Sequence, residues 1–256
     1  MKLTVLGCGT SSGVPRIGND WGRCDPANPR NRRRRVSILV EAGDARLLVD
    51  TGPDLREQLL DADVAWLTAV LFTHDHADHS HGIDDLRALF HATGTEIDCY
   101  MDEATRAGLR TRFRYVFAGR QGYPPTAKAH LIRDGMRFGP ISVRPFRQHH
   151  GPIHSIGYRF EADGVSIAYS TDVSGFPAES LPLLEGLDLW VVDALRRNPH
   201  PTHSHLEQTL AWIREAGPRE AWLTHMDQSM DHDELAAELP PMVSPAWDGR
   251  IWEGAQ

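Results

Sequence analysis

Six apolar segments of this sequence end directly in an aspartate or a histidine. They are RLLV before Asp50, AVLFT before His74, VRPFRQ before His149 and His150, SIAYST before Asp172, LWVV before Asp193 and AWLT before His225. Short apolar runs bounded by Gly, Pro, Asp or Asn are typical of buried strands. Loops that follow rigid strands can bring their side chains together at one edge of a sheet. The pattern therefore predicts one polar site assembled at the strand ends.

The order of these segments indicates an α/β fold. Segments 36–41 and 46–49 are joined through Gly43 and Asp44, which predicts an antiparallel hairpin, and later runs alternate with helical patterns, which favours helices layered over sheets. Strands are expected over 3–6, 36–41, 46–49, 69–73, 97–101, 141–147, 155–161, 165–170, 187–192 and 220–224. Helices are expected over 53–62, 82–93, 102–117, 204–216 and 231–239. The sequence thus predicts mixed sheets with helices outside.

Two of the expected helices carry start signals. Asp102 is a suitable N-cap for the helix over 102–117, and Ser204 with Glu207 has the spacing of a capping box. We expect both leading side chains to accept hydrogen bonds from the first backbone N–H groups of their helices.

Composition limits the class of protein. The chain has 256 residues, of which 41% are hydrophobic, with no linker-like segment and no repeat, so we expect a single domain over 1–256. No apolar run approaches the roughly 18 residues that a membrane span needs, and the three cysteines form no disulfide framework, which favours a cytoplasmic protein without membrane contact. The net charge of -8 argues against nucleic acid as a partner, because no global positive field would attract phosphates. A homodimer is left open.

The strongest local signal is the His-x-His-x-Asp-His run from His74 to His79, in a chain with 14 histidines. His74 and His76 in an extended turn project imidazoles to one side, and Asp78 and His79 reach a second position at the start of a helix. Imidazoles with carboxylates and no cysteine suit catalytic zinc, manganese or iron rather than a structural zinc. The competing reading is a solvated polar loop.

Two metals need about seven ligands, and the strand ends offer the rest: His150 or its neighbour His149, Asp172 and His225. Taken alone, each of these is more often an ordinary surface or capping residue. Their shared position after apolar runs favours ligation. Asp50 is either a turn residue or an acceptor that orients a ligand imidazole, and we favour the acceptor.

These residues resemble the metallo-β-lactamase-fold hydrolases, and within them the phosphoribosyl 1,2-cyclic phosphate phosphodiesterase branch, whose relatives include the tRNA 3′-processing endonuclease. The similarity covers essentially the whole chain. Besides the histidine run it includes the segments LGCGTSSGVP at 6–15, DTGPDLR at 50–56, HGIDDLR at 81–87, HPTH at 200–203 and LTHM at 223–226. It departs at Cys24, where the branch can carry a cysteine-rich structural zinc site and this chain has one cysteine.

The resemblance implies an αββα sandwich of two mixed β-sheets with outer helices and the site at one sheet edge. It implies two divalent metal ions, zinc or manganese. His74, His76 and His150 would hold one ion, Asp78, His79 and His225 the other, and Asp172 would bridge them. His150 is preferred to His149 because the family pattern is His-Gly.

Two metal ions a few ångströms apart generate a bridging hydroxide and clamp the oxygens of an in-line displacement. We expect the catalytic residues to be Asp78, as a metal ligand, and His203, as the acid that protonates the leaving alkoxide. The basic run from Arg30 to Arg35 could bind phosphate, which makes Arg33 and Arg35 candidate substrate contacts, or it could form a solvated, salt-bridged loop.

The sequence therefore predicts a metal-dependent hydrolase, a dinuclear phosphodiesterase acting on a small cyclic or nucleotide-like phosphodiester. Two alternatives remain: a nuclease that processes RNA ends, and a non-catalytic, metal-dependent nucleotide-binding sensor. Hydrolysis of thioesters or β-lactams uses the same metals, so the ligands alone do not exclude it.

Overall fold

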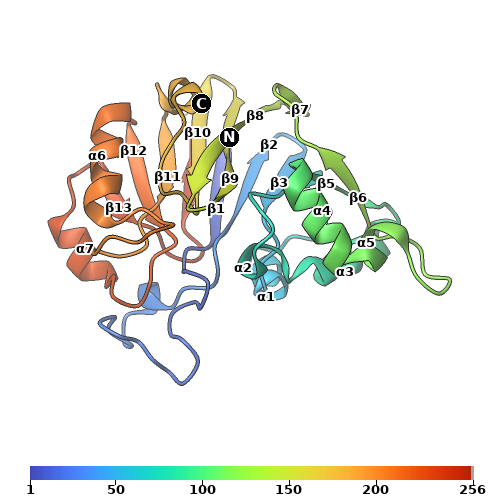
Figure 1. Cartoon of the computed structure of the whole chain (residues 1–256), viewed down its shortest axis with the longest axis horizontal. Helices are drawn as coiled ribbons and strands as arrows, with labels where there is room; N and C mark the ends of the chain where they lie inside the picture. Colours follow the sequence, from blue (N-terminus) through green and yellow to red (C-terminus); the bar gives the residue numbers. More distant parts are fainter. Residues whose placement is uncertain (255–256) are drawn as a thin grey trace.

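The computed structural model describes residues 1–254, which form two β-sheets of seven strands each (Figure 1). The first sheet has the order β14-β1-β2-β3-β4-β5-β6 and the second the order β13-β12-β11-β10-β9-β8-β7. The first sheet consists of β1 (Lys2–Gly7), β2 (Ser37–Ala42), β3 (Ala45–Val49), β4 (Ala69–Leu71), β5 (Ile97–Met101), β6 (Ala127–Leu131) and β14 (Ile251–Glu253). The second consists of β7 (Met136–Phe138), β8 (Ile141–His150), β9 (Ile153–Ala162), β10 (Val165–Ser170), β11 (Leu189–Asp193), β12 (Glu220–Thr224) and β13 (Val243–Pro245).

Both sheets are half antiparallel and half parallel. In the first sheet the pairs from β14 to β3 are antiparallel and those from β3 to β6 parallel. The second sheet repeats this pattern, since pairing is antiparallel from β7 to β10 and parallel from β10 to β13. Parallel strands place their carboxyl ends at the same edge of a sheet, which is where β3, β4, β10, β11 and β12 deliver the polar residues that follow them.

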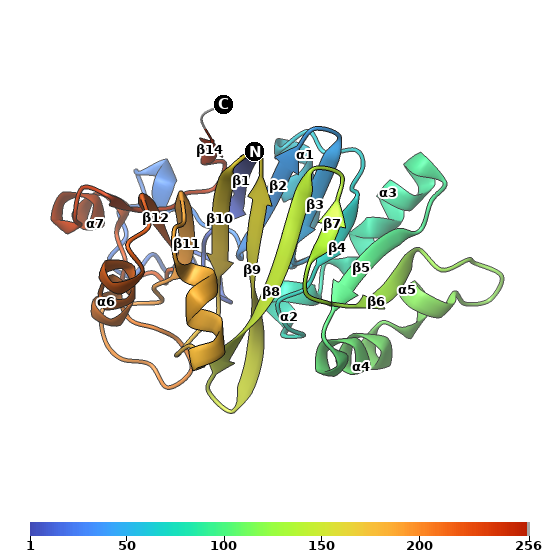
Figure 2. The same cartoon turned by 90° about the horizontal axis from the view of Figure 1, so that it is seen from above.

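Helices cover the outer faces of both sheets (Figure 2). The first sheet is covered by α1 (Leu55–Asp61), α2 (Ala77–Ser80), α3 (Leu86–Thr93), α4 (Glu103–Arg112) and α5 (Arg114–Ala118), and the second by α6 (Leu206–Ala216) and α7 (His232–Glu238). Three 3₁₀ turns join these elements: η1 (Pro29–Asn31), η2 (Ile83–Asp85) and η3 (Ala178–Leu184). The predicted αββα sandwich of mixed sheets is confirmed. No helix within residues 1–254 is both long and apolar enough to cross a membrane.

Strand alternation divides the core into two parts. Along β2, Ile38 and Val40 pack in the cluster that fills the space between the sheets, whereas Leu39 packs with Leu55 and Leu86 under the helices. Side chains on a strand alternate between its two faces, so a strand covered on both faces reads as a continuous apolar run. This explains why VSILVE shows no polar alternation.

The structure alters several predicted boundaries. The helix expected over 102–117 is interrupted at Phe113, which separates α4 from α5, and the helix over 82–93 begins as the 3₁₀ turn η2. Asp102 is confirmed as an N-cap, because its carboxylate accepts a hydrogen bond from the Thr105 N–H at 2.8 Å. The short strands β6, β7, β13 and β14 were not predicted, since three to five residues carry little periodic signal.

The predicted capping box at Ser204 is wrong. The helix α6 begins after His205, and no side chain caps it. The Ser204 hydroxyl instead donates to the Asp193 carbonyl at 2.7 Å, in a buried position at the end of β11. Ser204 therefore ties the helix start to the strand end that carries Asp193.

One largely buried carboxylate joins three distant segments of the chain. Asp248 accepts hydrogen bonds from the backbone N–H groups of Cys8 at 3.1 Å and Arg34 at 2.8 Å. Burial raises the pKa of Asp248 to about 6, although the donors from Arg34 and Cys8 oppose the shift. The folded protein consequently binds a proton at the Asp248 carboxylate more tightly than the unfolded chain does.

We therefore predict that Asp248 contributes a free energy of unfolding that rises as the pH falls from about 6 to about 4. A pKa of about 6 in the folded protein, against 3.8 for an ordinary aspartate, corresponds to about 3 kcal/mol of stability gained across that window. Denaturant unfolding of wild type and Asp248→Asn at several pH values should show this difference in pH dependence, whatever the absolute cost of the substitution. Asp44→Asn, at an exposed turn, should show none; equal pH dependence of wild type and Asp248→Asn would contradict the prediction.

Candidate metal centre

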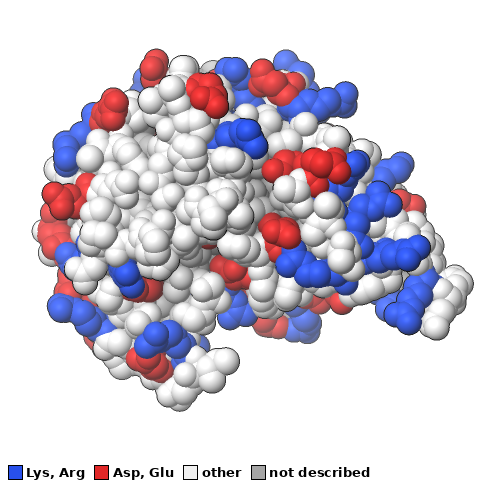
Figure 3. Space-filling view, viewed as in Figure 1, with Lys and Arg blue, Asp and Glu red and all other residues white. Residues whose placement is uncertain are grey.

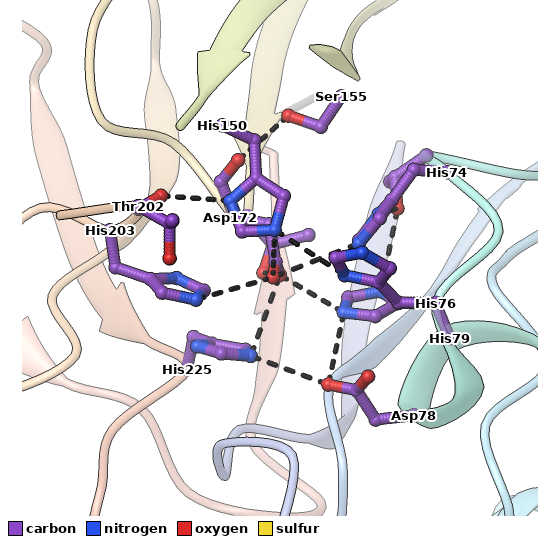
Figure 4. A network of polar contacts seen from close by, with 12 residues as sticks. His74, His76, Asp78, His79, His150, Ser155, Asp172, Thr202, His203 and His225 are labelled. Atoms are coloured by element: carbon purple, nitrogen blue, oxygen red, sulfur yellow. Dashed lines mark hydrogen bonds and ion pairs between the residues drawn. The ribbon is translucent and has the colours of Figure 1, made fainter. Parts of the chain in front are cut away.

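The predicted polar residues converge around the carboxylate of Asp172 (Figure 4). Three groups of side chains have ligand atoms within 4.8 Å of one another: His74, His76, His150 and Asp172 form the first, Asp78, His79 and His225 the second, and Asp172, His203 and His225 the third. They come from both sheets and from α2. The structure therefore brings all seven predicted ligand residues to one place.

The two oxygens of Asp172 face different groups. Oδ2 lies 3.5 Å from His150 Nε2 and 3.9 Å from His74 Nε2, whereas Oδ1 lies 3.0 Å from His79 Nε2 and 3.4 Å from His225 Nε2. A carboxylate placed in this way can bind one ion with each oxygen.

Asp50 and Thr73 hold two of the imidazoles from behind. His79 Nδ1 donates to Asp50 Oδ2 at 2.7 Å, and the same carboxylate accepts from the Thr73 N–H and hydroxyl, each at 2.8 Å. Because the Thr73 hydroxyl donates to Asp50, its oxygen accepts from His74 Nδ1 at 3.0 Å. Both imidazoles thus turn Nε2 toward Asp172. Asp50 has the orienting position that the sequence analysis favoured.

Asp193 has the corresponding position in the second sheet. Its Oδ2 accepts from His203 Nδ1 at 2.9 Å, and its Oδ1 lies 3.9 Å from His225 Nδ1. The sequence showed Asp193 at a strand end but gave it no role. His150 Nδ1 is held by the Thr202 carbonyl at 2.8 Å, a backbone contact that no sequence pattern reveals.

The donor set fits divalent metal ions. The Nε2 atoms of His74, His79 and His225 are buried and have no hydrogen-bond partner among residues 1–254. A buried polar atom without a partner is costly, and a metal ion satisfies a neutral imidazole nitrogen directly. Imidazoles with carboxylates suit zinc, manganese or iron.

Charge is concentrated on the buried acids. Burial alone would raise the pKa of Asp172, but the surrounding imidazoles of His225 and His79 hold that pKa well below its usual value. Burial would likewise lower the pKa of His225, yet Asp172 and Asp78 raise it to about 9. Asp172 is therefore ionised at neutral pH, as metal ligation requires, whereas a metal ion at His225 would have to displace the proton of that imidazole.

Three of these residues adopt left-handed backbone conformations. The φ angles of Asp50, Asp172 and His225 are 65°, 53° and 58°. Such angles are uncommon outside glycine, and Asp and His are among the residues that tolerate them best. Each follows a strand closely, so the sharp turn redirects the side chain into the site instead of along the strand.

A cavity of about 260 Å³ opens over this centre. Besides predicted ligands, its walls contain His203, Thr202, Ser11, Pro152 and Ile153. Ser11 follows β1 in a segment that the sequence analysis quoted without assigning it a contact. His150 lies in the site, whereas His149 is exposed beside His154. Because successive side chains of β8 point to opposite faces, only His150 of the two neighbours reaches the site.

The prediction that Arg33 contacts substrate is wrong. Arg33 is 2% exposed, and its guanidinium donates to the carbonyls of Met230 at 2.6 Å and Asp227 at 3.2 Å. It lies against Cys24 and fastens the loop there to the chain before α7. Arg35 is paired with Asp54 at 3.0 Å and Arg34 with Asp61. Arg30 and Arg32 instead lie over tryptophan rings, so two of the five arginines are salt-bridged.

Comparisons with known proteins agree with this geometry. Residues 45–226 match the model of the beta-lactamase superfamily domain. The crystal structure of a new diphosphatase from the PhnP family is 36% identical, with a TM-score of 0.90, and the match covers 98% of this chain and 96% of that one. Zn²⁺-bound PqqB from Methylobacterium extorquens, at 18% identity and a TM-score of 0.78 over 99% of this chain and 100% of that one, shares the fold.

Two curated proteins extend the comparison. An octanoyltransferase of Porphyromonas gingivalis is 34% identical over 97% of this chain, but this chain spans only 51% of that protein. Ribonuclease Z of Mycobacterium bovis is 26% identical over 88% of this chain and 85% of its own length. The chain thus corresponds to about half of one curated relative and to most of the other.

We predict that Asp50→Ala weakens metal binding by about 10–100-fold, the usual effect of removing a carboxylate that orients a ligand imidazole. Metal content after dialysis and titration against a competing chelator would measure it. Asp75→Ala is the matched control, because Asp75 lies in the same histidine run but pairs with Arg112. Equal metal affinity of the two variants would show that Asp50 has no such role.

Proposed function

The chain belongs to the beta-lactamase superfamily, whose members are hydrolases, and within it to the PhnP family, and from this premise we propose that it hydrolyses a small cyclic or nucleotide-like phosphodiester. The observation that carries the proposal is the position of Asp172, whose two oxygens face two separate groups of imidazoles. The second substrate class that we consider is a phosphate anhydride, because the similar PhnP-family protein is a diphosphatase.

The proposed centre holds two divalent ions, zinc or manganese. One ion would be held by His74, His76 and His150, and the other by Asp78, His79 and His225. Asp172 would serve both. When bound, two such ions lower the pKa of a coordinated water and stabilise the charge that develops in an in-line displacement at phosphorus.

Local charge explains how an acidic protein would bind an anionic substrate. The chain carries a net charge of -8, but two divalent ions would bring four positive charges against the carboxylates of Asp78 and Asp172. In a buried site these charges are screened far less than surface charges. The substrate would therefore meet a positive centre inside an acidic molecule.

His203 is the proposed proton donor to the leaving oxygen. Asp193 accepts from its Nδ1, which fixes the ring and leaves Nε2 facing the cavity, 3.7 Å from Asp172 Oδ2. His203, Asp172 and His225 come close enough to form a ligand group of their own, so metal content must be measured in any His203 variant.

The cavity favours a small substrate. A volume of about 260 Å³ lies just below the range of roughly 300–1,000 Å³ that is usual for ligand sites. Pro152 and Ile153 offer an apolar wall beside the polar centre. A nuclease acting on RNA ends is the second candidate, supported by the similarity to ribonuclease Z.

Substrate preference tests the proposal. The metal-loaded protein should hydrolyse small cyclic or linear phosphodiesters, or a nucleoside diphosphate ester, faster than structured RNA with a 3′ extension, at equal concentration. Faster cleavage of the RNA would favour the nuclease. Thioester hydrolysis without any phosphodiester or diphosphate turnover would leave the metal centre and overturn the proposed reaction.

We predict that His203→Ala slows hydrolysis of a diester with a sugar alkoxide leaving group by about 10²–10⁴-fold. Bis(p-nitrophenyl) phosphate should be affected much less, because nitrophenolate leaves without protonation. Asp193→Asn should show the same dependence on the leaving group, with a smaller loss of rate. Equal losses on both substrates, with metal content intact, would mean that His203 binds phosphate or positions the site instead.

A further inference from the structure

A second cavity, of about 270 Å³, lies between α3, α5 and the loop 119–126. Its walls share no residue with those of the metal cavity. Three aromatic side chains line it, Phe90, Tyr115 and Tyr123, together with two arginines, Arg87 and Arg120. Nothing in the proposed reaction uses this cavity.

The loop 119–126, which forms the rim of this cavity, is a hydrogen-bonded turn. Arg120 and Tyr123 exchange backbone hydrogen bonds of 3.0 and 2.9 Å, and Thr126 N–H donates to the Val116 carbonyl at 2.9 Å. Gly119 turns the chain at a φ of 66°, where a Cβ would come within 2.4 Å of the Tyr123 carbonyl. This geometry holds the Tyr123 ring at the rim, although that side chain is 66% exposed.

The cavity is positively charged. Neither Arg87 nor Arg120 forms an ion pair with a carboxylate among residues 1–254, in a chain where acidic residues outnumber basic ones by 35 to 27. The Arg87 guanidinium lies 5.3 Å from the centre of the Tyr123 ring and its Nε donates to His91 Nε2 at 3.2 Å. Figure 3 shows basic side chains concentrated on this side of the molecule, where Figure 1 places α4 and α5.

Asp84 supplies a hydrogen-bond acceptor. The Tyr115 hydroxyl donates to its Oδ2 at 2.6 Å, and Oδ1 has no hydrogen-bond partner within residues 1–254. Partial burial and this contact raise the pKa of Tyr115 to about 12, so the phenol stays protonated at neutral pH. The acceptor and the two guanidinia therefore lie around an aromatic wall.

We propose that this cavity is an accessory binding site for a mononucleotide, separate from the metal centre. Aromatic rings stack with a base, paired guanidinia bind a phosphate through several hydrogen bonds, and a free carboxylate oxygen accepts from an exocyclic amine. The volume suits one nucleotide rather than an oligomer. Asp84 follows α2 in the chain, and Arg112, which precedes α5 but does not line the cavity, donates to the Asp75 carbonyl at 2.6 Å.

Adenosine monophosphate is the probe. Calorimetry on the metal-loaded protein should show that it binds more tightly than adenosine or ribose 5-phosphate. Arg87→Gln and Arg120→Gln should each raise its Kd about tenfold or more, and Tyr123→Ala about fivefold or more. Arg110→Gln, an exposed arginine of α4 outside the cavity, is the matched control and should leave the Kd unchanged. All four side chains are on the surface rather than in the core, and thermal unfolding would confirm that each variant is folded.

Photolabelling locates the bound nucleotide without reference to turnover. The 8-azido derivative of adenosine monophosphate should modify residues of the segments 84–91 and 115–126, and excess unlabelled nucleotide should suppress this. Labelling confined to the walls of the metal cavity, or Kd values equal in Arg87→Gln, Arg120→Gln and wild type, would overturn the proposal. Either result would leave the proposed phosphodiesterase reaction untouched, because neither measures hydrolysis.

Discussion

The charge of the buried Asp172 carboxylate is the constraint on which the site depends. A carboxylate that is 2% exposed is stable only when positive or hydrogen-bonding groups surround it. Its neighbours come from the ends of β4, β8 and β12 and from α2, so both sheets must meet with their carboxyl ends at one edge. The same convergence fixes the register of the sheets, because a shift of one residue would turn these side chains away.

Two further carboxylates make this arrangement rigid. Asp50 in the first sheet and Asp193 in the second each follow or end a strand and hold an imidazole from behind. The site therefore has a matching support on each side, in keeping with two sheets that repeat the same half-antiparallel, half-parallel pattern. Both of these supporting carboxylates are themselves fully buried.

The strand ends, and the residues that converge at the candidate site, were predictable because each is encoded locally. An apolar run that stops at Asp or His predicts a strand and a polar side chain at the end of that strand. The roles of Arg33 and Ser204 could not be read in this way. Arg33 binds carbonyls almost 200 residues away, and Ser204 donates to a carbonyl that only the folded strand β11 brings near it. The order of strands within each sheet, and the cavity beside α5, also depend on contacts between distant segments.

The pairing of β1 with β14 brings the first and last strands of the fold together. Lys2 lies opposite Glu253, and the Gly254 N–H donates to the Met1 carbonyl at 3.0 Å. Figure 1 shows both ends of the chain at the top, whereas α2, which carries Asp78 and His79, lies toward the bottom. A module whose two ends are adjacent can be inserted into a longer polypeptide at a single point, and a domain attached at either end would lie away from α2 and the candidate metal centre. The fold thus places the points where another domain could be joined and the candidate metal centre at different ends of the molecule.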